Sequence, residues 1–226
     1  MLSREKESMR EQEGKKKITE IKTFPVPFAL GEIKENITIT TNTPSKPSKE
    51  QIIKQAMKLH LKGDIQEATK YYQYFINQGY KDYRVFSNYG AILKDLGKLN
   101  EAELLLKKAI EINSDFAKSY YNLGNILREL GKFKEAELYT RKAIDLNPNY
   151  AKAYSNLGSI LSDLGNLKEA ELSTHKAIKL DSNFIDAHYN LGCILSHLGK
   201  LKEAELSMQK AIELKPDFAK AYYSLS

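Results

Sequence analysis

The sequence predicts an all-α protein, a solenoid of stacked helix–turn–helix repeats that follows a disordered N-terminal tail. Two observations carry this prediction: small residues recur at an interval of 34 residues, and apolar residues recur between them at helical spacing. A third observation, a change in composition near residue 48, separates the repeats from the tail.

Residues 1–48 are expected to form the disordered polar tail. This segment contains four of the six prolines of the chain, and its stretch 38–48, rich in Thr, Asn, Ser and Pro, has too little apolar surface to fold. The tail also contains a basic run at 15–17 and an apolar island, FPVPFALG, at 24–31. The island is either an apolar part of a disordered tail with no specific partner or a short linear motif. Such a motif would dock on a partner or on a groove of the same protein. We favour the first interpretation.

Several residue types recur in one register from residue 49 onwards. The glycines that are 34 residues apart are Gly63, Gly97, Gly131, Gly165 and Gly199. An alanine follows each of these glycines by five residues, and the triplet Asn-Leu-Gly recurs at 122–124, 156–158 and 190–192. One period shared by different residue types indicates a repeat architecture. We count five complete units and one partial unit, with the boundaries 49–82, 83–116, 117–150, 151–184, 185–218 and 219–226.

The unit 117–150 shows why each repeat is expected to form a helical hairpin. Its first half has residues of one helix face at i, i+3, i+4 and i+7, namely Tyr120, Leu123, Gly124 and Leu127. Gly131 then ends the first helix, because glycine tolerates the left-handed conformation that follows many helices. A second helical stripe starts at Phe133 and stops at Pro148, since proline cannot continue a helix.

Small residues predict where the helices come closest. Gly124 and Ala136 should allow the two helices of one hairpin to approach each other, and Ala143 should lie where the second helix meets the next hairpin. A single hairpin buries too little apolar surface to offset the entropy of ordering it, so the units must stack.

Composition narrows the function classes. The net charge is +6, from 35 Lys and Arg against 29 Asp and Glu, but opposite charges alternate along most of the chain, which argues against nucleic acid as a partner. No apolar run approaches the roughly 18 residues that a membrane span needs, and no signal peptide is recognisable. The single cysteine, Cys193, fits a reducing compartment, so we expect a cytoplasmic protein.

Motifs for catalysis or cofactor binding are not found. The sequence has no glycine-rich phosphate loop, no Ser-His-Asp set and no prominent carboxylate pair. Cys193 and His197 are spaced i, i+4 and could hold a soft metal weakly, but a structural zinc site needs four ligands, so we interpret them as polar surface residues. We therefore expect no enzyme activity, no cofactor and no metal.

The repeats resemble the tetratricopeptide repeat (TPR) family, in the form of a bacterial tandem array. The residues of unit 117–150 that match the family pattern are Tyr120, Leu123, Gly124, Leu127, Ala136, Ala143 and Pro148. The resemblance covers about residues 49–226 and implies a right-handed α-solenoid whose first helices line a concave groove. The first unit, 49–82, departs most from the pattern, as expected for a terminal repeat.

The resemblance also implies which residues face a bound peptide. The sixth residue of four successive units is an asparagine: Asn88, Asn122, Asn156 and Asn190. An asparagine side chain both donates and accepts, so this ladder could pair with the backbone of an extended peptide. Alternatively, these asparagines only tolerate a solvated position or tie adjacent hairpins together. The other expected groove residues are Arg84, Lys118, Lys152, Tyr121, Asn125, Arg128 and Tyr189.

A slightly acidic or mixed-charge peptide should fit this groove best. The carboxylate clamp found in some family members is not expected, because Tyr121 and Asp186 occupy positions where the clamp needs lysine.

The sequence thus predicts a scaffold that binds other proteins or peptides. By analogy with similar bacterial arrays, the alternative is a substrate-recruiting N-terminal arm or fragment of a larger enzyme such as a glycosyltransferase, sulfotransferase or oxygenase. A third hypothesis is self-association through the partial unit 219–226, where Tyr222 and Leu225 repeat the apolar face of a first helix.

Overall fold

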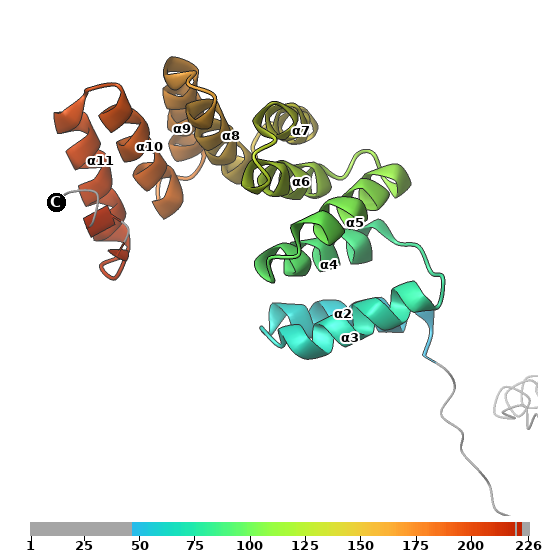
Figure 1. Cartoon of the computed structure of the whole chain (residues 1–226). Helices are drawn as coiled ribbons and strands as arrows, with labels where there is room; N and C mark the ends of the chain where they lie inside the picture. The colour runs from blue at the N-terminus through green and yellow to red at the C-terminus, as the bar shows by residue number, and fades with distance from the viewer. Residues whose placement is uncertain (1–46, 220, 223–226) are drawn as a thin grey trace, which may run out of the picture. The chain divides into compact units, whose positions relative to one another are not determined.

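The computed structural model describes residues 47–219, 221 and 222, which form α-helices joined by short turns and contain no strand (Figure 1). The helices of this part of the chain are α2 (Lys49–Leu61), α3 (Ile65–Asn77), α4 (Tyr83–Asp95), α5 (Leu99–Ile112), α6 (Ala117–Glu129), α7 (Phe133–Leu146), α8 (Ala151–Asp163), α9 (Leu167–Leu180), α10 (Ile185–His197) and α11 (Leu201–Leu214). The prediction of an all-α array of stacked helical hairpins is confirmed. The expected disordered tail, with its basic run and apolar island, lies outside the described residues except for Pro47 and Ser48.

The turn inside each hairpin follows the glycine signal. After α6, Gly131 has φ +73°, its N–H donates to the carbonyl oxygen of Arg128 at 3.0 Å, and the N–H of Lys132 donates to that of Leu127 at 2.8 Å. These two bonds satisfy carbonyl groups that the end of the helix leaves without partners. The predicted end of α6 at Gly131 is therefore confirmed, and α7 ends at Leu146, two residues before Pro148.

The first helix, α2, begins with a capping box that composition alone did not indicate. The N–H of Ser48 donates to Oε1 of Gln51 at 2.7 Å, and the N–H of Gln51 donates to Oγ of Ser48 at 3.2 Å. This reciprocal pair satisfies two donors at the start of the helix. Ser48, the last residue of the expected tail, thus caps α2.

Close packing inside each hairpin explains the recurrent small residues. A Cβ atom added at Gly124 would overlap Oγ1 of Thr140 on α7 and would lie 3.3 Å from the carbonyl oxygen of Ala136. Ala143 is fully buried in a cluster with Tyr120 and Ala153, the latter on α8. Both predicted contacts, within the hairpin and with the next hairpin, are confirmed.

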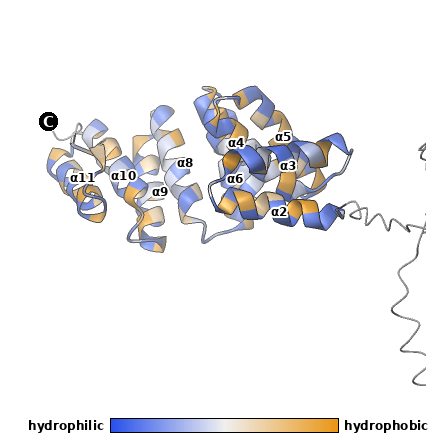
Figure 2. Cartoon of the chain, turned by 90° about the horizontal axis from the view of Figure 1, so that it is seen from below, coloured by the Kyte–Doolittle hydropathy of each residue, from blue (hydrophilic) through white to orange (hydrophobic). Residues whose placement is uncertain are grey.

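The hairpins stack through alternating helices. Each second helix packs on the following first helix, as α5 does on α6, α7 on α8 and α9 on α10. The first helices of consecutive units also contact each other, in the pairs α4–α6, α6–α8 and α8–α10, whereas the second helices make no comparable contact in the described residues. The first helices are therefore the more closely spaced row. Figure 2 shows apolar and hydrophilic residues alternating along each helix, as expected for helices with one buried face.

One glutamate of a second helix is buried. Glu103 on α5 is only 8% exposed. Its carboxylate accepts from Nζ of Lys107 at 2.6 Å and from Nζ of Lys132, in the next unit, at 2.9 Å. The hydrogen bond from Lys107 is the largest cause that lowers the pKa of Glu103. Glu103 thus links two units.

Candidate functional site

The asparagine ladder lies along the row of first helices. Its four members come from α4, α6, α8 and α10 in order, and the first three are 8–9% exposed: Asn88, Asn122 and Asn156. Asn190 is half-buried. These side chains were expected to face a ligand, so the hydrogen bonds that they already make decide how much binding capacity remains.

Three ladder members bond to a neighbouring unit. Nδ2 of Asn156 donates to Oγ1 of Thr140 at 3.3 Å, and Nδ2 of Asn190 donates to Oγ of Ser155 at 3.0 Å. Oδ1 of Asn88 accepts from Nζ of Lys118 at 3.0 Å. These contacts support the alternative interpretation for these three residues, namely that they tie adjacent hairpins together.

Asn122 differs from the other ladder members. Its Nδ2 atom is buried and has no hydrogen-bond partner in the described part of the chain. An unpaired buried donor costs about 1–3 kcal/mol, so native proteins rarely keep one without a structural or functional reason. Among the four asparagines, Asn122 therefore has the strongest case for meeting a ligand.

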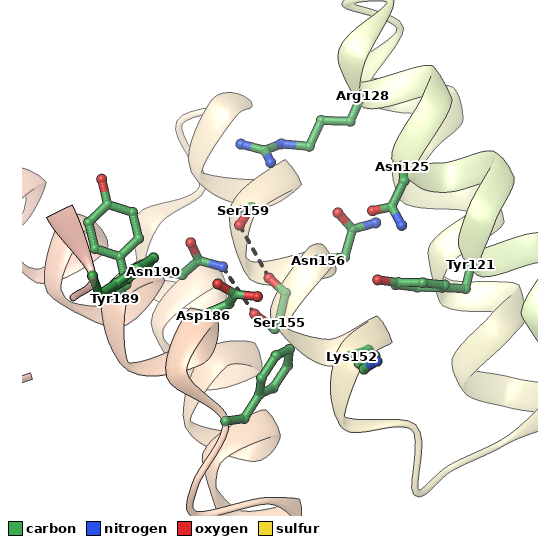
Figure 3. Close-up of a pocket in the computed structure, with 12 residues that line it drawn as sticks. Tyr121, Asn125, Arg128, Lys152, Ser155, Asn156, Ser159, Asp186, Tyr189 and Asn190 are labelled. Atoms are coloured by element: carbon green, nitrogen blue, oxygen red, sulfur yellow. Dashed lines mark hydrogen bonds between the residues drawn. The ribbon is translucent and has the colours of Figure 1, made fainter. Parts of the chain in front are cut away.

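Seven of the eleven predicted groove residues line one hollow of about 210 Å³ across α6, α8 and α10 (Figure 3). They are Tyr121, Asn125, Arg128, Lys152, Asn156, Tyr189 and Asn190. The structure therefore brings together residues up to two units apart. The other four predicted residues, which do not line this hollow, are Arg84, Asn88, Lys118 and Asn122.

Five lining residues were not among the predicted groove residues: Ser155, Ser159, Phe184, Asp186 and Phe218. A sequence signal for two of them existed. An aromatic residue recurs every 34 residues just before a first helix, as Phe116, Tyr150, Phe184 and Phe218. This series could have pointed to the aromatic residues that line the hollow.

The hollow lies where a unit lacks an aromatic ring that both adjacent units have. Tyr121 pairs with Tyr150 at a ring-centroid distance of 5.0 Å, and Tyr189 pairs with Phe218 at 5.4 Å. Ser155 occupies the equivalent position in the unit between them, as Ser87 does two units earlier, so the unit of Phe184 has no ring at that position. The space that such a ring would fill remains open between Tyr121 and Tyr189 (Figure 3).

Two predicted groove cations are neutralised by carboxylates of the same chain. Arg84 donates to Asp82 at 2.8 Å and to Glu50, in the preceding unit, at 3.1 Å. The hydrogen bond to Asp82, followed by the one to Glu50, raises the pKa of Arg84. Nε of Arg128 donates to Oδ2 of Asp163, in the following unit, at 2.5 Å. Both arginines therefore join adjacent units, and Arg128 also lines the hollow.

Two other charged residues at the hollow stay without an ion pair in the described residues. Lys152 and Asp186 are both exposed, and they start α8 and α10 from equivalent positions two residues into each unit. Lys118, at the same position of the preceding unit, has its pKa lowered by partial burial and then by the charge of Lys152. One cation and one anion at the hollow thus have no ion-pair partner among the described residues.

The described residues contain no group of three His, Cys, Asp or Glu side chains placed to hold a metal ion. Cys193 is half-buried and His197 is exposed. None of the helices with described residues combines the length and the apolar character needed to cross a membrane.

Family models match most of the central repeats. Tetratricopeptide repeat models match residues 117–150, 139–171 and 185–218, and a TPR repeat model matches residues 90–131. The chain is a tetratricopeptide repeat protein. None of the curated proteins matches the sequence of this TPR protein significantly.

Solved structures of other TPR proteins share its fold. YrrB, described as a TPR protein with an unusual peptide-binding site, is 24% identical, with a TM-score of 0.61 over 78% of this chain and 91% of that chain. MamA is 28% identical, with a TM-score of 0.60 over 73% and 96%. A thermophilic TPR protein from Thermus thermophilus, TTC0263, is 19% identical, with a TM-score of 0.66 over 79% and 97%.

Proposed function

We propose that this TPR protein is a non-catalytic scaffold that binds an extended segment of another protein along the row of first helices α4, α6, α8 and α10. The observation that carries the proposal is the hollow at Ser155, where side chains of three successive first helices converge. A site that crosses several units suits an extended chain, because each unit can contact a successive part of it. The description of YrrB as a peptide-binding TPR protein adds support.

Asn122 is the residue we assign to the backbone of the bound segment. Its Nδ2 atom lacks a partner, and the torsion that orients a side-chain amide is broad, so the group can turn toward a carbonyl oxygen in the groove. The remaining asparagines of the ladder also hold adjacent units together through the hydrogen bonds that they already make. Only the atoms that these bonds leave free can contact the segment.

The charges at the hollow favour a segment with both signs. Lys152 offers a cation and Asp186 an anion, and neither is paired with a described residue. A mixed-charge segment can satisfy both groups, whereas a uniformly charged one would leave one of them opposed by like charge. The single cysteine fits a reducing compartment, so we place this binding in the cytoplasm.

A selected peptide tests the proposal. Random peptides displayed on phage are selected for binding to the immobilised full chain. A selected peptide is then synthesised, and calorimetry measures its affinity for the wild type and for Asn122→Ala. We expect the substitution to weaken binding about fivefold or more, the effect of one net hydrogen bond.

The matched control is Asn100→Ala, because Asn100 is an exposed asparagine on α5, a second helix. Affinity should stay at the wild-type value in this variant. Failure to select any peptide, or equal binding by wild type and Asn122→Ala, would contradict the proposed groove.

A further inference from the structure

Two interruptions of the repeat pattern meet at the hollow. In the fifth position of consecutive units, Ser155 stands between Tyr121 and Tyr189. In the second position, Asp186 follows a basic series of Arg84, Lys118 and Lys152. Figure 3 shows Ser155 and Asp186 beside each other, on α8 and α10. Serine also stands at the fifth position in Ser87, and an acidic residue also stands at the second position in Glu50. A serine followed in the next unit by an acidic second residue occurs only at Ser155 and Asp186, so this combination sets the place apart from the other units.

We propose that the hollow at Ser155 is a subsite for one arginine side chain of the bound segment. The inference rests on the proposed function, because it names the side chain that the groove selects. The hollow, at about 210 Å³, is smaller than the roughly 300 Å³ at which small-molecule pockets begin, so it suits a single side chain.

The polar floor of the hollow presents acceptors. Nδ2 of Asn190 donates to Oγ of Ser155, and Oγ of Ser159 donates to the carbonyl oxygen of Ser155 at 3.3 Å (Figure 3). Nδ2 of Asn156 donates to Thr140, away from α10. These donors are already engaged, whereas Oδ1 of Asn156, Oδ1 of Asn190 and the carboxylate of Asp186 receive no bond from a described residue. Three acceptor groups at the hollow therefore have no donor among the described residues.

An arginine side chain can donate to these acceptors. Its guanidinium carries five N–H donors in a planar fork that matches a carboxylate, here that of Asp186. The same plane stacks on aromatic faces, which Tyr121, Phe184 and Tyr189 provide around the hollow. A phenylalanine would fill the space but leave the acceptors unpaired, and a lysine would bring only a point charge.

The cations near the hollow do not cancel this preference. Arg128 is held by Asp163, so its charge is already compensated. Lys152 has no ion pair with a described residue and is the natural partner for an acidic residue elsewhere in the segment. The subsite therefore adds a defined position for arginine to the mixed-charge preference of the groove.

Blocked single amino acids test the subsite without an identified ligand. The ¹⁵N-labelled full chain is titrated with N-acetyl-arginine N-methylamide and with the citrulline derivative, a neutral molecule of nearly the same shape, while amide shifts are followed by NMR. We expect the arginine derivative to shift the resonances of Ser155, Asp186 and Tyr189 and to bind at least about tenfold more tightly than citrulline, as expected for hydrogen bonds to a charged group. Equal affinities, or shifts confined to other residues, would overturn the proposal.

Variants taken from the neighbouring units sharpen the test. Ser155→Tyr restores the ring present at Tyr121 and Tyr189, and Asp186→Lys restores the residue present at Lys118 and Lys152, so both are compatible with the repeat. Each should reduce binding of the arginine derivative about tenfold or more. Glu111→Lys, the same charge change at an exposed position of α5, should leave it unchanged. Wild-type affinity in Asp186→Lys with intact helical circular dichroism would overturn the subsite.

The two proposals fail in different ways. Suppose that selected peptides require Asn122 for binding but keep their affinity when citrulline replaces every arginine. This result would support the groove and contradict the arginine subsite. If blocked arginine binds at Ser155 while no extended peptide binds, the hollow takes an arginine-like ligand and the scaffold proposal falls.

Discussion

Nδ2 of Asn156 donates a hydrogen bond to Oγ1 of Thr140 at 3.3 Å, from α8 to the second helix of the preceding unit. Both side chains are buried, at 8% and 0% exposure. Asn122 stands at the same position one unit earlier, yet its Nδ2 has no partner among the described residues. Two residues that are identical by repeat position thus differ in what they contribute to the fold.

Stability measurements should separate these two asparagines. Asn156→Ala leaves the buried hydroxyl of Thr140 without its donor, so we expect the free energy of unfolding to fall by about 1–3 kcal/mol. Asn122→Ala removes a donor that has no partner among the described residues, so we expect the free energy of unfolding to fall by no more than about 0.5 kcal/mol, or to rise. Urea unfolding followed by circular dichroism measures both. Equal losses in the two variants would show that Asn122 has a structural partner after all.

The close approach of α8 and α9 leads us to expect that a side chain at Gly158 destabilises the fold. A Cβ atom at Gly158 would overlap Oγ1 of Thr174 and lie 3.1 Å from the carbonyl oxygen of Ala170. We expect Gly158→Ala to lower the free energy of unfolding by about 1–3 kcal/mol, as overpacking does. The double variant Gly158→Ala/Thr174→Ala removes the overlapping hydroxyl and should recover part of this loss relative to Thr174→Ala alone. A fully additive double variant would argue against the overlap as the cause.

Burial decides the effect of leucine substitutions. Leu123 on α6 is fully buried, whereas Leu138 on α7 is 67% exposed. Leu123→Ala should cost about 2–5 kcal/mol of unfolding free energy, because it removes apolar contacts and leaves a cavity. Leu138→Ala, the same chemical change on the surface, should stay within about 0.5 kcal/mol. Comparable costs in the two variants would mean that Leu138 is buried in solution.

A half-buried histidine should make stability depend on pH. Nδ1 of His60 lies 3.4 Å from the hydroxyl of Tyr72. Burial, followed by the charge of Lys118, lowers the pKa of His60 below 6.5, with Asp95 acting in the opposite direction. The folded chain therefore disfavours the protonated form, so the contribution of His60 is complete above pH 6.5 and declines as the pH falls below it.

The measurement is the free energy of unfolding at several pH values between about 7.5 and 5.5, across the ordinary titration range of histidine. His60→Gln should lose less stability than the wild type over this interval. His197→Gln, at an exposed position on α10, is the control and should retain the wild-type dependence. If the free energy of unfolding of His60→Gln depended on pH as strongly as that of the wild type, His60 would not be the cause of the pH dependence.

Local patterns predicted the hairpins well because their causes are local. Gly131 ends α6 through its own backbone conformation, and Gly124 is required by side chains at a fixed distance along the same unit. The capping box is also visible in the sequence, as Ser48 followed three residues later by Gln51. We did not predict it, because the proline-rich composition before it led us to assign Ser48 to the tail.

The candidate site was predicted only in part. Repeat register gathered Tyr121, Asn156 and Tyr189 correctly on one face, because equivalent positions point the same way in equivalent units. It could not show that Ser155 leaves a hollow, since an empty space depends on which neighbouring ring fails to fill it. Phe184 was missed for the same reason, although its recurrence every 34 residues was visible.

The sequence by itself determined the helices, their pairing in hairpins and the family, because these follow from contacts within one 34-residue unit and from the conformations open to glycine and proline. Only the tertiary structure decided which polar groups are already satisfied. Arg84 bonds to Glu50 and Arg128 bonds to Asp163, and each partner lies about one unit away in the chain. These contacts depend on the spacing of the stacked units, which does not follow from the sequence of any single unit. The same spacing left Nδ2 of Asn122 without a partner among the described residues and opened the hollow at Ser155.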